Sequence, residues 1–324
     1  MENILLIRLK AIGDVIFTLP AVSVLRAHHP DAKISFLASK ENASLLRGFR
    51  EVNQVIALDR AALKKGNPLT MSLEFLGLLR RLRAGRFSLV VDFQGFGETA
   101  WMSWLTGAPQ RWGSVYGHGR RWAYTRGLRR NDRAHPADWN LQLLAGCGLA
   151  SPAIRNEFVL PDDSLVAAQQ FLDQNSLDAT QPTLLIQPFT SSAQKNWPLE
   201  NFLTVARHWR ERGVQVIFVG GPGDRARLEP ARAGKFCVAT GLPLLVSAGL
   251  AQLATLTLGG DTGLGHLAVA QGRRVVMLMM HKHPGACVPF QHPDWAIVPE
   301  RSQNIRDIAV NTVLAETAKV VGTV

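Results

Sequence analysis

The sequence has little cysteine and no long apolar segment typical of a membrane-spanning helix. Its 324 residues include three cysteines, which lie far apart and form no C-x-x-C pair. This pattern disfavours a disulfide framework or a zinc site and favours a reducing compartment. The longest uncharged stretch, 236–260, contains Pro243, Gln252 and several Gly, Ser and Thr residues, so a buried strand and helix explain it better than a span. The N-terminal apolar run is too short for a secretory signal, and we expect a cytoplasmic protein.

Three motifs that identify common nucleotide-dependent enzymes are also missing. The turn after the first apolar run reads KAIGDV and lacks the G-x-G-x-x-G fingerprint of dinucleotide-binding folds. The sequence contains neither a G-x-x-x-x-G-K-[ST] loop nor a D-x-D pair, which commonly holds a metal-bound diphosphate. We therefore expect no metal or resident cofactor, and we expect a lysine and helix N-termini to balance the charge of any bound diphosphate.

Positive charge is in excess, and most of the excess lies in the first half of the chain. The formal net charge is +11; residues 1–160 hold 22 Lys and Arg against 12 Asp and Glu, and residues 161–324 hold 14 against 13. Seven arginines and one acid lie between Arg111 and Arg133. This bias predicts an anionic partner: a membrane surface, a phosphorylated substrate or nucleic acid. Nucleic acid is disfavoured because no RNA- or DNA-reading motif is present.

Short apolar runs alternate with helical patterns along the chain, which predicts βαβ units and parallel sheets. In the first half we expect strands within 2–9, 32–39, 53–59 and 87–95, with helices at 14–28, 42–47, 70–83 and 137–149. The pattern restarts after a proline-flanked linker near 160. We expect an α/β protein of two Rossmann-like domains, 1–160 and 161–324, facing a central cleft. The last helix, about 307–320, is free in this scheme to pack back on the N-terminal domain.

Ligands of open parallel sheets bind beyond the carboxyl ends of the strands, so four strand-to-helix turns are candidates for a site. The first holds Asp14, which is either a helix cap or a carboxylate placed for chemistry. The stretch QPFTSSAQKNWP offers Thr190, Ser191 and Lys195 at a helix start, which suits a phosphate or a plain cap. The turn GGDTGLGH offers Asp261, Thr262, Gly263 and His266, with Asp261 or Thr262 as the helix cap and with Thr262 and His266 on one helix face. It suits a pyrophosphate, or it is a glycine turn with a core histidine. In GGPGD, Asp224 either accepts from ribose hydroxyls or caps the next helix.

Six blocks of the sequence occur in the order found in one enzyme family. They read ILLIRLKAIGDVIFTLPAVSVLRAHHPDAKISFLAS, VVDFQGFGETA with RWG, HPADWNLQLLAGCGL, FTSSAQKNWPLENF, GGPGD and GDTGLGHLAVAQG. In these blocks the chain resembles glycosyltransferase family 9, the ADP-heptose:lipopolysaccharide heptosyltransferases. The resemblance implies a GT-B architecture, with the acceptor bound by the N-terminal domain and the nucleotide-sugar by the C-terminal one. It also implies inverting, metal-independent transfer of heptose to the lipopolysaccharide inner core, at the cytoplasmic face of the inner membrane.

The resemblance also implies roles for individual residues. Asp14 would be the general base; Thr190, Ser191 and Lys195 would hold the diphosphate; Asp261, Thr262, Gly263 and His266 would bind donor sugar and phosphates; and Asp224 would lie near the ribose. Basic residues of the N-terminal half, with Arg111, Arg120 and Arg121 as candidates, would bind the anionic acceptor. A helix start stabilises a carboxylate by only about 0.3–1 kcal/mol, too little to exclude Asp14 as a base.

One loop departs from the family pattern. After the GDTG helix the family runs into an F-G-P-T-like turn, whereas this chain has LMMHKHPGACVPF, with Met280 at the glycine position and His281–Pro284 following. The departure leaves open another nucleotide-sugar donor, or a sugar-nucleotide epimerase on the same fold. A non-enzymatic carbohydrate- or membrane-binding protein is a further alternative. The arginine bias and the Gly13-Asp14 turn favour the transferase.

Overall fold

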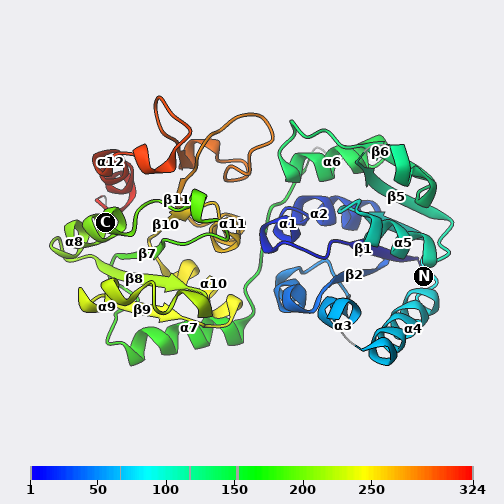
Figure 1. The fold of residues 1–324 in the computed structure, drawn as a ribbon, viewed down its shortest axis with the longest axis horizontal. Helices are drawn as coiled ribbons and strands as arrows, with labels where there is room; N and C mark the ends of the chain where they lie inside the picture. The colour runs from blue at the N-terminus through cyan, green and yellow to red at the C-terminus, as the bar shows by residue number, and fades with distance from the viewer. Residues whose placement is uncertain (1, 66, 117, 151–152, 323–324) are drawn as a thin grey trace. The chain divides into compact units, whose positions relative to one another are not determined.

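The chain folds into two compact units, Met1–Phe158 and Val159–Val324, each built around one parallel sheet. The computed structural model describes residues 2–65, 67–116, 118–150 and 153–322 (Figure 1). Each sheet has six strands and carries helices on its faces. The α/β class with two parallel sheets, predicted from the alternating pattern, is confirmed.

The sheet of the N-terminal unit has the strand order β3-β2-β1-β4-β5-β6. Its central strands β1 and β4 are mainly apolar, and residues Ile4–Ile7 are fully buried, as expected for strands covered on both faces. The strands are β1 (Asn3–Ile7), β2 (Lys33–Ser39), β3 (Gln54–Leu58), β4 (Leu89–Asp92), β5 (Gln110–Val115) and β6 (Arg126–Arg129). The helices are α1 (Ile12–Ile16), α2 (Leu19–His28), α3 (Arg60–Lys65), α4 (Pro68–Ala84), α5 (Gly97–Leu105) and α6 (Pro136–Gly146), with 3-10 segments η1 (Lys40–Gly48) and η2 (His118–Ala123).

The first predicted helix, 14–28, is divided in two. Helix α1 ends at Ile16, and α2 begins at Leu19 with Pro20 in its first turn. Proline lacks the N–H that an interior helical position needs, and it is tolerated at a helix start. The split places Asp14 in a separate one-turn helix directly after β1.

The sheet of the C-terminal unit has the strand order β12-β11-β10-β7-β8-β9. Its strands are β7 (Thr183–Gln187), β8 (Gln215–Gly220), β9 (Cys237–Thr240), β10 (Leu256–Gly260), β11 (Val275–Leu278) and β12 (Ala296–Ile297). The helices are α7 (Asp162–Gln174), α8 (Leu199–Arg210), α9 (Glu229–Ala233), α10 (Leu244–Leu253), α11 (Gly263–Ala270) and α12 (Val310–Val321), with 3-10 segments η3 (Ala193–Lys195), η4 (Pro222–Asp224), η5 (Pro293–Trp295) and η6 (Ile305–Asp307). Between β8 and β9 the chain forms the 3-10 turn η4 and then the short α9.

The last helix, α12, belongs to the core of its own unit. Its buried residues Val313 and Val321 join the cluster around β7, β8 and α8, and the Trp209 indole N–H donates to the Thr317 hydroxyl at 3.0 Å. The indole of Trp197 likewise donates to the Ile308 carbonyl at 3.0 Å. Within its own unit, α12 packs beside α8.

Two further expectations can be compared with the described chain. The expectation of no disulfide framework agrees with the described residues, in which Cys147, Cys237 and Cys287 form no disulfide bond. Within the described residues, no helix combines the length and the hydrophobicity needed to cross a bilayer.

Candidate active site

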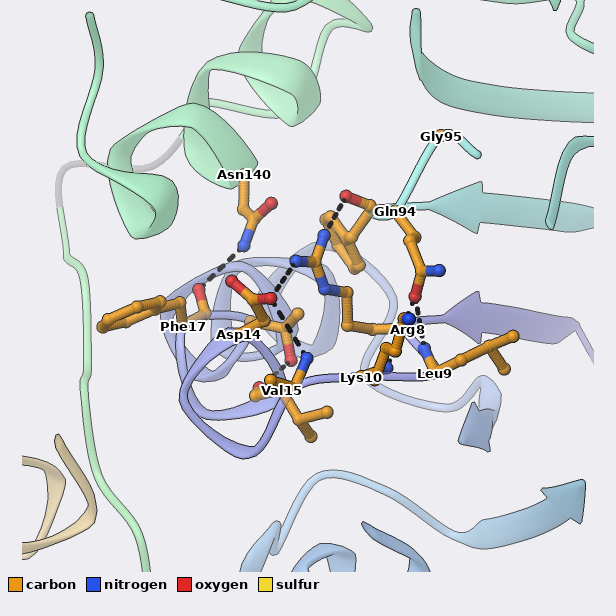
Figure 2. A network of polar contacts seen from close by, with 12 residues as sticks. Arg8, Leu9, Lys10, Asp14, Val15, Phe17, Gln94, Gly95 and Asn140 are labelled. Carbon is orange, nitrogen blue, oxygen red and sulfur yellow. Dashed lines mark hydrogen bonds and ion pairs between the residues drawn. The ribbon is translucent and has the colours of Figure 1, made fainter. Parts of the chain in front are cut away.

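Asp14 lies at the carboxyl end of β1, where α1 begins (Figure 2). It is the third residue of this helix, and its Oδ2 accepts the Ala11 N–H at 3.0 Å. The carboxylate therefore satisfies one of the free donors at the helix start. Its side chain stays 34% exposed, so the carboxylate that caps the helix is also accessible from outside the fold.

A buried arginine holds the same carboxylate. The Arg8 guanidinium contacts Asp14 Oδ2 at 2.6 Å and donates to the Phe93 carbonyl at 2.9 Å. Arg8 is only 9% exposed. It directly follows β1 in sequence, and its hydrogen bond to Phe93 joins it to the end of β4. Figure 2 shows the guanidinium lying between the carboxylate and the turn after β4. Among the described residues, the contacts of the Asp14 carboxylate fall on Oδ2, which leaves Oδ1 for a ligand.

The turn after β4 fixes the backbone that carries Arg8. Gln94 Oε1 accepts the N–H of Leu9 at 2.8 Å and lies 3.4 Å from that of Lys10. Buried Asp92 accepts from the N–H groups of Gln94 and Gly95, at 2.9 and 3.0 Å, and from the Tyr124 hydroxyl at 2.7 Å. Burial raises the pKa of Asp92, although these donors oppose the shift. This network joins β1 to β4 below Asp14.

Helix α6 fixes the other side of the α1 turn. Asn140 on α6 is buried, and its side-chain amide donates to the Phe17 carbonyl, just after α1, at 2.9 Å (Figure 2). The Phe17 ring meets the His135 ring edge-on at 4.8 Å. The short helix carrying Asp14 is therefore held from β1, β4 and α6.

The three candidate arginines have different surroundings. Arg111 donates to the carbonyls of Ala108 and Ala123, at 2.5 and 2.9 Å, so its guanidinium is already used within the β5 region. Arg120 lies 3.4 Å from the Gly95 carbonyl, in the turn after β4. Arg121 is exposed. The structure thus brings Arg120 close to the network around Asp14 and does not bring Arg111 there.

In the C-terminal unit, Asp261 lies between Lys195 and His266. Its Oδ2 contacts Lys195 Nζ at 2.8 Å, and its Oδ1 contacts His266 Nε2 at 2.9 Å. Burial raises the pKa of Asp261, but the hydrogen bonds and charges of His266 and Lys195 outweigh burial and hold it at about 2. Burial lowers the pKa of Lys195, but Asp261 outweighs it, so the net shift is upward. The pair is therefore charged at neutral pH, with Lys195 half-exposed and available to an anion.

The loop after β7 and the start of α11 are tied together near this pair. Thr262 is the N-cap of α11: its hydroxyl accepts the Gly265 N–H at 3.1 Å and donates to Gln187 Oε1 at 2.6 Å. Gly263 is the first residue of α11, directly after this cap. A Cβ on Gly260 would lie 2.6 Å from Thr190 Cγ2, so the loop after β7 approaches β10 as closely as only glycine permits.

The hydroxyl groups of the 190–192 loop differ in their hydrogen bonding and exposure. The Thr190 hydroxyl donates to the Ser192 carbonyl at 2.8 Å, whereas Ser191 is exposed at the loop surface. The Thr190 N–H is bonded to Asn196 Oδ1 at 2.7 Å. Thr190 therefore shapes the loop, and Ser191 and Lys195 are its accessible polar groups.

Asp224 is engaged in local contacts. Its carboxylate accepts the Gly221 N–H at 3.0 Å and pairs with Arg227 at 3.0 Å. Arg227 in turn lies over the Phe189 ring, 3.5 Å from its centroid. The cap predicted for Asp224 is thus formed, at η4.

The loop that departs from the family pattern lines a pocket of about 210 Å³ together with Lys195 and Asp261. The rings of His281 and His283 stack there with centroids 3.5 Å apart. Burial and the neighbouring His283 lower the pKa of His281, which favours its neutral form. The pocket is lined by Lys195, Asp261, Leu278, Met279, Met280, His281, His283, Gly285, Ala286, Cys287 and Ile305. Within the described residues, no group of three or more His, Cys, Asp and Glu side chains forms a metal site.

Sequence reasoning missed several residues that build these sites. Arg8, Gln94 and Asn140 act on the turn around Asp14, and Gln187 acts on the Thr262 cap. Arg8 and Gln187 each stand at a strand end, which is a detectable signal in a parallel sheet. Asn140 lies inside a helix, where sequence alone gives no indication of its distant partner.

Comparison with known proteins places the whole chain among related sequences and structures. Residues 75–309 match the model of glycosyltransferase family 9, described as heptosyltransferase. The lipopolysaccharide core heptosyltransferase OpsX of Haemophilus influenzae is 23% identical over 304 residues, covering 90% of this chain and 83% of that protein.

Two crystal structures extend the comparison to the fold. A family 9 glycosyltransferase from Veillonella parvula has a TM-score of 0.88 at 22% identity and covers 100% of this chain and 98% of its own. Escherichia coli heptosyltransferase WaaC, solved with ADP-2-deoxy-2-fluoro heptose, has a TM-score of 0.77 at 20% identity, covering 98% and 99%. These likenesses confirm the GT-B-like heptosyltransferase fold.

Proposed function

We propose a specific reaction for this chain, which belongs to glycosyltransferase family 9, the heptosyltransferase family. The reaction is inverting transfer of heptose from ADP-heptose to the inner core of lipopolysaccharide, either to Kdo-lipid A or to a heptose already on it. The donor assignment is supported by the ADP-sugar bound to the related E. coli enzyme. The acceptor assignment is supported by the core heptosyltransferase among the relatives and by the basic N-terminal unit.

Asp14 is the general base in this proposal. The acceptor hydroxyl attacks the anomeric carbon from the face opposite ADP; the new C–O bond forms as the bond to the diphosphate breaks, and Asp14 takes the hydroxyl proton. The observation that carries the assignment is the carboxylate itself: Arg8 and the Ala11 N–H hold Oδ2, and Oδ1 is left to receive a proton. Because Arg8 is buried and tied to Phe93, the base is oriented before the acceptor binds.

Lys195 and the turns around Asp261 bind the donor. The half-exposed Lys195 ammonium neutralises the diphosphate and stabilises the charge that develops on ADP as it leaves. Ser191, Thr190 and the start of α11, with Thr262 and Gly263, supply further polar groups at the same sheet edge. Asp261 and His266 orient Lys195 and contact the donor, and Asp224 lies at the ribose end. The chemistry assigned to these residues requires no metal.

The alternative that the sequence left open, another nucleotide-sugar, is favoured by one feature. His281, His283 and Met280 line the pocket beside Lys195 where the family has an F-G-P-T-like turn. A donor whose base or sugar differs from ADP-heptose would meet these side chains. The acceptor side of the proposal is unchanged in that case, because it rests on the N-terminal unit.

The acceptor is anionic and lipid-linked, so the enzyme works at the cytoplasmic face of the inner membrane as a peripheral protein. Arg120 lies 3.4 Å from the Gly95 carbonyl in the turn after β4, and the next residue, Arg121, is exposed. We assign them to Kdo carboxylate or lipid A phosphate contacts. Arg111 supports them by fixing the backbone of the β5 region.

The test is release of the nucleoside diphosphate from a panel of nucleotide-heptoses and nucleotide-hexoses, with and without truncated Kdo-lipid acceptors. The proposal predicts release that depends on both ADP-heptose and acceptor. Acceptor-dependent release of nucleotide from another nucleotide-sugar, with none from ADP-heptose, would establish the alternative donor. Interconversion of a free nucleotide-sugar without acceptor would establish an epimerase and overturn the proposal.

A further inference from the structure

Exposed apolar side chains are concentrated in one part of the fold. Thirteen large hydrophobic residues are exposed in the described chain, and twelve of them lie in the N-terminal unit. Nine of the twelve come from α4, α5, η2 and the residue that follows β5: Leu69, Met71, Leu73, Phe75, Leu76, Trp101, Trp104, Tyr116 and Trp122. Such a concentration marks an interaction surface on a folded protein.

Three tryptophans form the centre of this surface. Trp101 and Trp104 lie on one side of α5, and Trp122 of η2 packs against both. The ring centroids are 4.7 to 6.1 Å apart, with the rings edge-to-face. Each tryptophan is still 45–53% exposed, although the rings already cover one another. We call these three residues the tryptophan cluster.

Helix α4, at the edge of the N-terminal unit in Figure 1, lies beside α5. It carries a second apolar feature. Its inner side is buried through Leu78 and Leu82, yet Leu69, Leu73 and Leu76 are 51–70% exposed. Spacings of three and four residues place these leucines along one helix side. We call Leu69, Leu73 and Leu76 the leucine stripe.

The two helices that carry the leucine stripe and the tryptophan cluster are in contact. Arg83 follows Leu69 and Leu76 at intervals of seven residues, so it extends the side of the stripe. Its guanidinium donates to the Leu105 carbonyl at 2.5 Å, and Leu105 directly follows Trp104 on α5. This hydrogen bond links the helix that bears the stripe to the end of α5 beside Trp104.

The segment that contains both the leucine stripe and the tryptophan cluster is strongly basic. Residues 68–133 contain 11 arginines and four acids, and one of these acids, Asp92, is buried. Arg80 is exposed on the stripe side of α4, and Arg120 and Arg121 directly precede Trp122. Tryptophan prefers the headgroup level of a bilayer, and each nearby Lys or Arg contributes about 1 kcal/mol on an anionic surface.

We propose that the tryptophan cluster and the leucine stripe dock the N-terminal unit onto an anionic phospholipid bilayer, with the arginines at the headgroups. A second copy of the chain is disfavoured, because a two-fold contact through this surface would set like charges against each other. Nucleic acid is disfavoured because aliphatic leucines offer no stacking platform for bases. The inference rests on the proposed lipid-linked acceptor, since docking would bring the enzyme to that acceptor.

The test is flotation of the full chain with vesicles that contain no acceptor. One set is pure phosphatidylcholine, and the other carries phosphatidylglycerol at a membrane-like fraction. We expect binding to the anionic vesicles that weakens at high salt, and quenching of tryptophan fluorescence when brominated lipids are included. Trp101→Ser with Trp104→Ser, and separately Leu73→Ser with Leu76→Ser, should each lower the partition coefficient about tenfold or more.

Val166→Ser is the matched control, because Val166 is 54% exposed but lies in the C-terminal unit. It should leave vesicle binding unchanged. Thermal unfolding and ADP binding of every variant confirm that the chain is folded. Unchanged vesicle binding in both double variants would overturn the inference. So would sedimentation showing that either double variant breaks a dimer, because a second copy would then be the occupant.

The proposed docking surface and the proposed transfer reaction can be contradicted by different results. Transfer to a water-soluble truncated acceptor, with no vesicle binding, would overturn the docking surface and leave the proposed function standing. Vesicle binding through the tryptophan cluster without transfer to any acceptor would overturn the proposed function and leave the surface standing.

Discussion

The buried guanidinium of Arg8 contacts the carboxylate of Asp14 at 2.6 Å and is anchored at the same time to the Phe93 carbonyl. One side chain thus links the end of β4 to the proposed base at the end of β1. Because Arg8 touches neither donor nor acceptor in this account, it is a positioning residue. Its effect should appear in turnover and not in nucleotide binding.

Arg8→Lys tests this role. Lysine keeps the charge but cannot reach Asp14 and Phe93 with a planar fork, so the carboxylate loses its fixed orientation. We expect kcat to fall by about tenfold to a hundredfold, with the Kd of ADP unchanged. Arg50→Lys, at a 68% exposed position, is the matched control and should keep normal turnover. Equal kcat values for the two variants would remove Arg8 from the account.

Lys195→Gln tests the phosphate site. The ammonium is half-exposed and held by Asp261, ready to exchange that partner for a diphosphate. Loss of a charge-assisted contact of this kind should raise the Kd of ADP by about tenfold or more, measured by calorimetry. Lys235→Gln, on the exposed turn before β9, is the control in the same unit. Equal ADP affinity in the two variants would exclude Lys195 from the phosphate site.

The stability contributed by Asp261 depends on pH in a defined direction. Its pKa is lowered from 3.8 to about 2, so the folded state favours the carboxylate. The contribution is complete above about pH 4 and is lost as the pH falls toward 2; the shift corresponds to about 2 kcal/mol. The free energy of unfolding in urea should therefore be higher for wild type than for Asp261→Asn at pH 6, with a smaller difference at pH 3. A difference that is constant with pH would contradict the ion-pair explanation.

Gly260→Ala should disturb the donor site without changing any polar group. The added Cβ would lie 2.6 Å from Thr190 Cγ2 and 3.4 Å from the Lys195 carbonyl, so the loop carrying these residues must move. We expect a stability loss of about 1–3 kcal/mol and weaker ADP binding. Gly223→Ala is the control, because a Cβ there meets no atom within 4 Å. Tight ADP binding by Gly260→Ala would show that this close approach is dispensable.

The sequence predicted the elements whose residues carry a strong local pattern. Apolar runs such as Asn3–Ile7 and Leu256–Gly260 became central strands, because strands buried on both faces are apolar throughout. Strands β5 and β6 were missed: QRWGSV and RGLR contain arginine and glycine, and lie toward one edge of the sheet. Helix α7 was missed because its proline-flanked start was interpreted as part of a linker.

In the candidate sites, too, the features that depend on neighbouring residues could be predicted and the others could not. The caps at Thr262 and Asp224 could be predicted, because capping depends on residues three apart in sequence. Contacts between residues far apart in the sequence could not be predicted in this way. The partners in the pairs Arg8–Phe93, Asn140–Phe17 and Lys195–Asp261 are separated by 66 to 123 residues. Arg111 was assigned to the acceptor by charge alone, although its guanidinium is bonded to backbone carbonyls.

The most direct test of the account is acceptor-dependent ADP release by Asp14→Asn, measured beside wild type and the exposed-site control Asp31→Asn. Asparagine keeps the size of the side chain but cannot take a proton, so release should fall by about a hundredfold or more. ADP should still bind and stabilise the variant against heat, because the donor residues lie in the C-terminal unit. Near-normal turnover by Asp14→Asn would contradict the assignment of Asp14 as the base.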